Sequence, residues 1–190
     1  MRTMFSATGL RAQGAVMLAI GLITATAFAA GSGTTHRGSG AATPDKPYAG
    51  QQQRVVSAFS GAELKMLRDG LGMGFAKAAE LNGYPGPLHI LELAKPLALA
   101  PDQRQTVQAA FDEMNAAARA LGPKLIAAEQ AVDAVFKNGA ADADALQRAV
   151  LHAAKVRAAL RQVHLNAHIK VTPVLSAEQR RRYQTLRGYK

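Results

Sequence analysis

Two histidines one helical turn apart are the residues whose type and spacing could bind a metal ion. His164 and His168 stand in an alanine- and leucine-rich stretch, and side chains four positions apart lie on one face of a helix. Imidazoles bind Zn(II), Cu(II) and Ni(II). If the chain turns back near residue 140, these histidines face the neighbourhood of Asp112 and Glu113, whose carboxylates could complete the site. The alternative is two exposed histidines that bind nothing.

Four basic residues form a second candidate site. Arg157 and Arg161 continue the helical stripe of the two histidines, and the same fold-back places Lys124 and Arg119 opposite them. A positive strip beside an apolar surface could attract an unfolded chain by charge and hold it through weak apolar contacts. The alternative is a solvated surface without any client.

The composition argues against several other functions. The chain has no cysteine, so it has neither disulfides nor a thiolate nucleophile. Its net charge is +10, but aromatic residues make up only 5% and tryptophan is absent, which argues against a platform for nucleic-acid bases. The serines fall in helix caps or linkers, and we expect no active-site pocket. We therefore predict neither an enzyme nor a nucleic-acid-binding protein.

The first thirty residues are typical of a signal peptide. Arg2 and Arg11 precede an apolar run at residues 15–28, and small residues suit cleavage near Ala29 or Ala30. An uncleaved anchor is the alternative, but the run is short for a membrane span, which needs about 20 apolar residues. We expect an exported protein with no stable membrane insertion after cleavage.

The remaining chain divides into a linker and one helical domain. Residues 31–53 are rich in Gly, Ser, Thr, Ala and Pro and predict a disordered linker, and residues 54–190 predict a single all-α domain. A first helix is expected over 60–82, with a bend or close packing at Gly70, Gly72 and Gly74, and a short helix over 87–95.

Two long helices with a repeating apolar seam should position the candidate sites. Apolar residues recur at alternating steps of three and four, from Val107 to Val135 and again from Leu146 to Val174. Asn138-Gly139 ends the first arm and Asp142 can cap the second, so the arms must lie antiparallel. Pro123 should bend the first arm. The narrow seam needs cover from the first helix, from a second copy of the chain, or from both.

A short box occurs at both ends of this predicted hairpin. The sequence Leu99-Ala100-Pro101-Asp102-Gln103 precedes it, and Leu175-Ser176-Ala177-Glu178-Gln179 follows it. Ser176 and Gln179 fit a capping box, in which each side chain bonds the other residue's amide. Ala100 has no side-chain oxygen, so the first box keeps only Pro101 and Gln103 as helix-start signals. Ser60 and Glu63 predict one more helix start of this kind.

The paired boxes around a bent helical hairpin resemble the Spy/CpxP family of periplasmic proteins, whose mark is a repeated Leu-Thr-x-x-Gln motif. The resemblance covers roughly residues 86–187, with Leu99, Gln103, Leu175, Ser176 and Gln179 at the motif positions. It implies a cradle-like all-α fold in the periplasm. Some relatives are ATP-independent chaperones that act as homodimers through a basic concave face, while heavy-metal sensors and zinc-resistance proteins of the same family bind metals.

The resemblance thus leaves two hypotheses. The first is a periplasmic chaperone or envelope-stress protein that holds unfolded envelope proteins on the basic strip as a homodimer, works without a cofactor and communicates with an envelope-stress sensor. The alternative is a metal sensor or resistance factor that binds Zn, Cu or Ni. Metal-sensing relatives carry a histidine and a methionine where His164 and His168 stand. The N-terminal histidine pair of those relatives has no counterpart here, and the nearest candidate is His89 with Glu92.

Overall fold

The computed structural model describes residues 46–137, 139 and 141–189, and in that part of the chain the structure is all-α, as predicted, with no strand. The helices are α1 (Gly61–Asp69), α2 (Lys77–Glu80), α3 (Pro87–Glu92), α4 (Pro101–Lys137), α5 (Ala143–Val171), the 3-10 helix η1 (Thr172–Val174) and α6 (Ala177–Leu186). The predicted signal peptide and residues 31–45 of the predicted linker lie outside the described residues. Residues 47–53 form turns.

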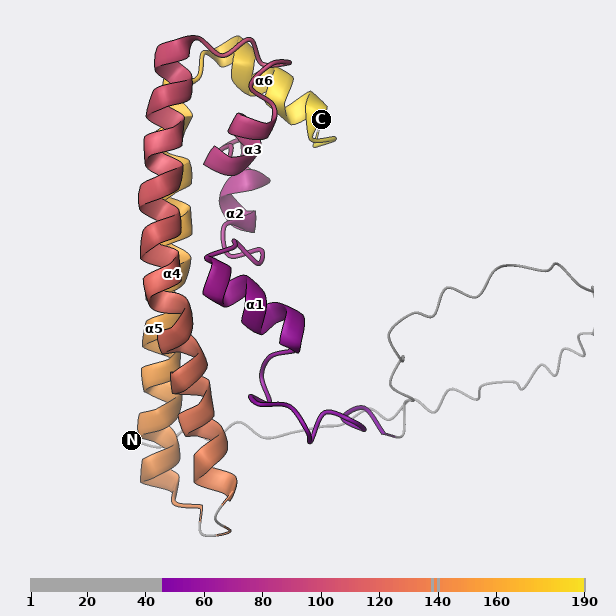
Figure 1. Ribbon diagram of the computed structural model, residues 1–190, viewed down its shortest axis with the longest axis vertical. Helices are drawn as coiled ribbons and strands as arrows, with labels where there is room; N and C mark the ends of the chain where they lie inside the picture. Colours follow the sequence, from indigo (N-terminus) through magenta and orange to yellow (C-terminus); the bar gives the residue numbers. More distant parts are fainter. Residues whose placement is uncertain (1–45, 138, 140, 190) are drawn as a thin grey trace, which may run out of the picture. The chain divides into compact units, whose positions relative to one another are not determined.

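Helices α4 and α5 form the predicted antiparallel hairpin and lie side by side (Figure 1). The Asp142 carboxylate accepts hydrogen bonds from the backbone amides of Asp144 and Ala145, which confirms its capping role. Pro123 lies inside α4 without ending it. The C-terminal part of α4 slopes away from the direction of its N-terminal part, as expected for a bent arm (Figure 1).

The seam of the hairpin is buried where another element covers it. Ala118, Leu125 and Leu160 are at most 2% exposed and pack against Phe59 and Leu67 from the preceding segment. Near the turn of the hairpin the cover ends, and the seam residues Val132, Val135 and Leu146 are only partly buried. The first helix therefore supplies part of the cover that the narrow seam requires.

The prediction of one first helix over residues 60–82 is wrong. Ser60 and Glu63 form the expected capping box, but α1 ends at Gly70, which adopts the left-handed conformation with φ 70°. The Gly70 amide donates to the Leu67 carbonyl and the Leu71 amide to the Met66 carbonyl, a typical helix stop. The glycines thus end the helix instead of bending it, and only the four-residue α2 resumes before residue 82.

Helix α1 meets α4 at a glycine. A Cβ atom placed on Gly122 would lie 2.0 Å from the Leu67 carbonyl oxygen, so no side chain fits between the two backbones. Gly122 therefore sets how closely α1 approaches the hairpin.

The two boxes hold the two ends of the hairpin together. Ser176 and Gln179 form the predicted capping box, and the Ala100 amide donates to Gln103 Oε1 at 3.1 Å. The side chains of Gln103 and Gln179 also donate to each other in both directions at 2.9 Å. This reciprocal pair joins the start of α4 to the start of α6.

A second apolar cluster lies at this end of the hairpin. Ile90, Leu97, Val107, Val171 and Tyr183 are at most 2% exposed and come from α3, the loop after it, α4, α5 and α6. Between this cluster and the one under α1 lies the segment at residues 70–89. Among the described helices, none is long and apolar enough to cross a membrane.

Candidate functional site

A cavity of about 520 Å³ lies between residues 70–89 and the facing sides of α4 and α5. Its lining is mainly apolar and includes Met73 from the loop after α1, and Phe111 and Met114 from α4. His164 and His168 line it from α5. A mainly apolar cavity of this size with a few polar groups has the usual features of a ligand site.

His164 is a buried imidazole with an unused nitrogen. The residue is 2% exposed, and Nε2 has no hydrogen-bond partner among the residues that the structure describes. The ring stacks on Phe75, with 5.9 Å between centroids and 16° between planes. Burial, and secondarily the nearby His168, lowers the pKa of His164 below its ordinary value. His164 is therefore neutral near pH 7, the form in which imidazole binds a metal ion.

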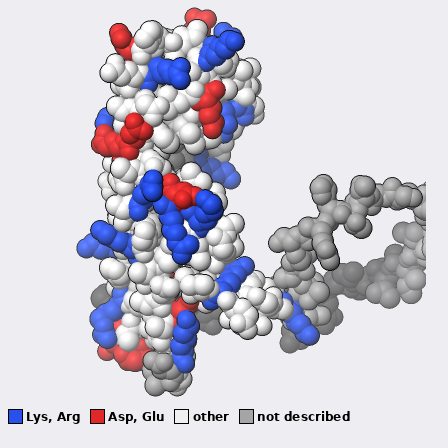
Figure 2. Space-filling view, viewed as in Figure 1, with Lys and Arg blue, Asp and Glu red and all other residues white. Residues whose placement is uncertain are grey.

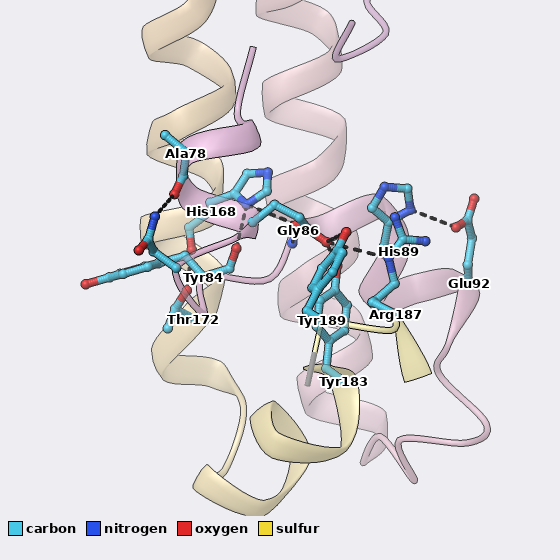
Figure 3. A network of polar contacts seen from close by, with 12 residues as sticks. Ala78, Tyr84, Gly86, His89, Glu92, His168, Thr172, Tyr183, Arg187 and Tyr189 are labelled. Carbon is cyan, nitrogen blue, oxygen red and sulfur yellow. Dashed lines mark hydrogen bonds and ion pairs between the residues drawn. The ribbon is translucent and has the colours of Figure 1, made fainter. Parts of the chain in front are cut away.

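His168 is held in place by a hydrogen bond at its Nδ1 atom. Its Nδ1 lies 2.8 Å from the carbonyl oxygen of Tyr84 (Figure 3). The same nitrogen lies 3.6 Å from Glu80 Oε2. A carbonyl oxygen can only accept a hydrogen bond, so His168 Nδ1 carries a proton and donates it to the Tyr84 oxygen. In the neutral ring this leaves the lone pair on Nε2. Metal-binding histidines are commonly fixed by a bond of this kind.

Glu80 joins the cavity wall to the C-terminus of the described chain. Tyr183 and Tyr189 donate their hydroxyl groups to Oε1, the latter at 3.2 Å, and Arg187 Nε lies 3.6 Å from the same oxygen. The Gly86 amide donates to Oε2 at 3.1 Å. Burial, and then the bond to Glu80, raises the pKa of Tyr183, so that its hydroxyl stays protonated. In Figure 3 the labelled side chains of Tyr183, Arg187 and Tyr189 lie close together.

The structure brings only part of the predicted metal site together. The histidines do face the expected part of α4, because Phe111, Met114 and Asn115 line the same cavity. Asp112 and Glu113 lie on the exposed side of that helix, where Asp112 accepts from Gln108 and Glu113 pairs with Lys170.

Neighbouring helix positions point about 100° apart, so residues 111, 114 and 115 share the inner face while 112 and 113 do not. Within residues 46–137, 139 and 141–189, no three His, Asp or Glu side chains are grouped so as to hold a metal ion. The metal-ligand role of His164, His168, Asp112 and Glu113 stays a prediction. His89, whose Nδ1 lies 2.9 Å from Glu92 Oε2, also lines the cavity.

The four residues of the predicted basic strip are all exposed. Arg157 and Arg161 line a second cavity of about 480 Å³ together with Phe75, and the Arg157 guanidinium lies 5.7 Å from the centre of the Phe75 ring. Arg119 packs against Gly70. A Cβ atom placed on this glycine would lie 2.9 Å from the Cγ atom of Arg119. Lys124 is exposed on α4. On the face shown in Figure 2, acidic side chains lie between the basic ones.

Sequence reasoning missed the residues that complete the cavity. Glu80, Tyr183 and Tyr189 are far apart in the chain, and only the folding of α6 against residues 80–86 brings them together. Met73 gave no signal by its spacing, whereas Met114 lies in the part of α4 that the histidines were expected to face. The glycine-rich stretch at 70–74 was a usable signal, because alternating glycines are typical of a loop as well as of a bent helix.

The comparisons with known proteins give one match. A family model described as heavy-metal resistance matches residues 83–182, which is more than half of the chain and includes both boxes, α4 and α5. This family has the Spy/CpxP-like helical fold, so the resemblance is confirmed at the level of the fold and not for Spy/CpxP itself. No curated protein and no solved structure matches the chain.

Proposed function

The chain belongs to the heavy-metal resistance family, and from this premise we propose that it binds a transition-metal ion in the cavity lined by His164 and His168. Binding would serve metal tolerance or sensing. The sequence features of residues 1–30 support an exported, periplasmic protein as part of the same proposal.

One observation carries the proposal: His164 Nε2 has no hydrogen-bond partner among the described residues. Buried polar atoms normally have a hydrogen-bond partner, because an unpaired one costs about 1–3 kcal/mol. A metal ion bound directly to His164 would give this atom the partner that it lacks. His168, one turn further along α5, offers its own Nε2 because the Tyr84 carbonyl occupies Nδ1.

The test replaces the histidines one at a time and together with alanine. We expect His164→Ala and His168→Ala each to lower metal affinity at least about tenfold, since losing even a supporting partner of a ligand typically costs 10–100-fold. The measurement is competition against a chromophoric chelator with Zn(II), Ni(II), Cu(II) and Cu(I). His152→Ala is the matched control, because His152 is exposed on α5. Unchanged affinity in the double variant, with folding verified by circular dichroism, would contradict the proposal.

Holding of unfolded proteins is the second candidate, and the position of Arg157 and Arg161 beside Phe75 supports it. The two guanidinium groups lie beside the apolar side chains of this cavity, Ala154 and Ala158 among them, so charge and apolar surface occur together, as a loosely bound client would require. We expect Arg157→Glu with Arg161→Glu to weaken suppression of light scattering by an aggregating model protein. Arg148→Glu, on an exposed position of α5, is the control. Equal suppression by wild type and variant would exclude this surface.

A further inference from the structure

We infer that the cavity selects copper(I) over divalent metal ions, with Met73 and Met114 as thioether ligands beside the two histidines. The inference rests on the proposed function and adds the identity of the ion. Met73 and Met114 line the same cavity as His164 and His168. Soft thioether sulfur favours Cu(I), whereas carboxylate and water oxygens suit harder ions.

Among the described residues that line the cavity, Glu80 has the one carboxylate, and its lone pairs are already occupied. Glu80 accepts from the Tyr183 and Tyr189 hydroxyls and the Gly86 amide, and the Arg187 guanidinium lies within ion-pair distance. An ionised carboxylate has about four lone-pair positions, so these donors leave little for a metal. The cavity therefore offers neutral nitrogen and sulfur ligands.

The charges around the cavity also disfavour a divalent ion. Lys77 lines the cavity, and the Arg187 guanidinium lies 3.6 Å from the Glu80 carboxylate. The cost of taking an ion out of water rises with the square of its charge, and unpaired buried charges are expensive. A monovalent ion thus enters this apolar, partly positive site at a much lower cost than Zn(II) or Ni(II).

The backbone at Met73 supports a functional role for its side chain. Met73 has φ 43° and Gly74 has φ 76°, and the Phe75 amide donates to the Gly72 carbonyl at 2.7 Å across these two residues. A turn with positive φ at both central positions normally has Gly, Asn or Asp there. A side chain kept in this costly conformation is typical of functional sites. Here the turn places the Met73 side chain at the cavity.

The experiment compares metals in the wild type and in methionine variants. Met73→Leu, Met114→Leu and the double variant keep volume and apolar character, so they should remain folded. We expect the double variant to lose Cu(I) affinity at least about tenfold, measured without oxygen against a Cu(I) chelator, while its Zn(II) and Ni(II) affinities stay within about twofold. Met66→Leu is the matched control, because Met66 belongs to α1 and does not line this cavity.

X-ray absorption at the copper edge gives an independent readout. Wild type should show sulfur scatterers next to copper, and the double methionine variant should show fewer. The inference is overturned if wild type prefers Zn(II) or Ni(II), if the methionine variants bind Cu(I) like wild type, or if copper has no sulfur neighbour. The proposed function fails separately, when the histidine variants bind every metal like wild type.

Discussion

At the scale of single residues, His164 combines burial with an unpaired ring nitrogen in the described part of the chain. Its spacing from His168 suggested a chelating pair, but a sequence pattern cannot distinguish an exposed pair from a buried one. The structure buries both rings and leaves His164 Nε2 without a partner among the described residues. That burial has a consequence for stability as well as for metal binding.

We expect the stability of the metal-free protein to depend on pH through His164. Its pKa is lowered in the folded state, so below the ordinary value of 6.5 the unfolded chain binds the proton and the folded one does not. The contribution of His164 to the free energy of unfolding should therefore be complete above pH 6.5. It should fall as the pH drops from about 6.5 toward the lowered pKa. Urea unfolding between pH 5 and about pH 8 measures this.

The variant His164→Leu isolates this contribution from the neighbouring titratable and charged groups His168, Glu80 and Lys77. It should lose part of the pH dependence and be at least as stable as wild type near pH 7, because an unsatisfied buried atom is removed. His152→Leu is the exposed control. A pH dependence equal to that of wild type would contradict the assignment.

At the scale of elements, the contact between α1 and α4 decides how the seam is covered. The apolar pattern of α4 predicts which side is buried, but not what lies on it. Because Gly122 has no side chain, the Leu67 carbonyl contacts the backbone of α4 there. In this arrangement Phe59 and Leu67 pack on Leu125 and Leu160.

Replacing this glycine should loosen that contact. A Cβ atom 2.0 Å from a backbone oxygen cannot be accommodated without moving α1, so we expect Gly122→Ala to destabilise the protein by about 1–3 kcal/mol. Chemical unfolding followed by circular dichroism gives the value. Gly61→Ala is the control, because a Cβ atom on Gly61 would meet no atom of the described residues within 4 Å. If both variants unfold at the same urea concentration as wild type, α1 does not dock as described.

At the scale of the whole described part of the chain, polar contacts connect distant segments around the cavity. Glu80 joins α2 to Tyr183 of α6, and the Gln103–Gln179 pair joins α4 to α6. Because His168 lies against Glu80 and the Gly86 amide binds the same carboxylate, the C-terminal segment supports the cavity wall.

Tyr183→Phe tests this connection. It removes one donor from a buried carboxylate, and we expect a loss of about 1–3 kcal/mol of stability and weaker metal binding, because His168 would be held less firmly. Thermal unfolding and metal titration of the same variant measure the two effects. Tyr48→Phe, 77% exposed, is the control. Wild-type behaviour of Tyr183→Phe in both measurements would show that the network does not support the site.

The sequence by itself determined the helical class, the antiparallel hairpin, the caps at Ser60, Asp142 and Ser176, and the part of α4 that His164 faces. These features depend on periodicity and on hydrogen bonds between near neighbours, which local sequence specifies. Only the tertiary structure decided that Gly70 ends α1, that Asp112 points away from His164, and that residues 70–89 enclose a cavity with Met73 and Glu80. Such contacts join residues far apart in the chain, and their geometry depends on how closely backbones approach.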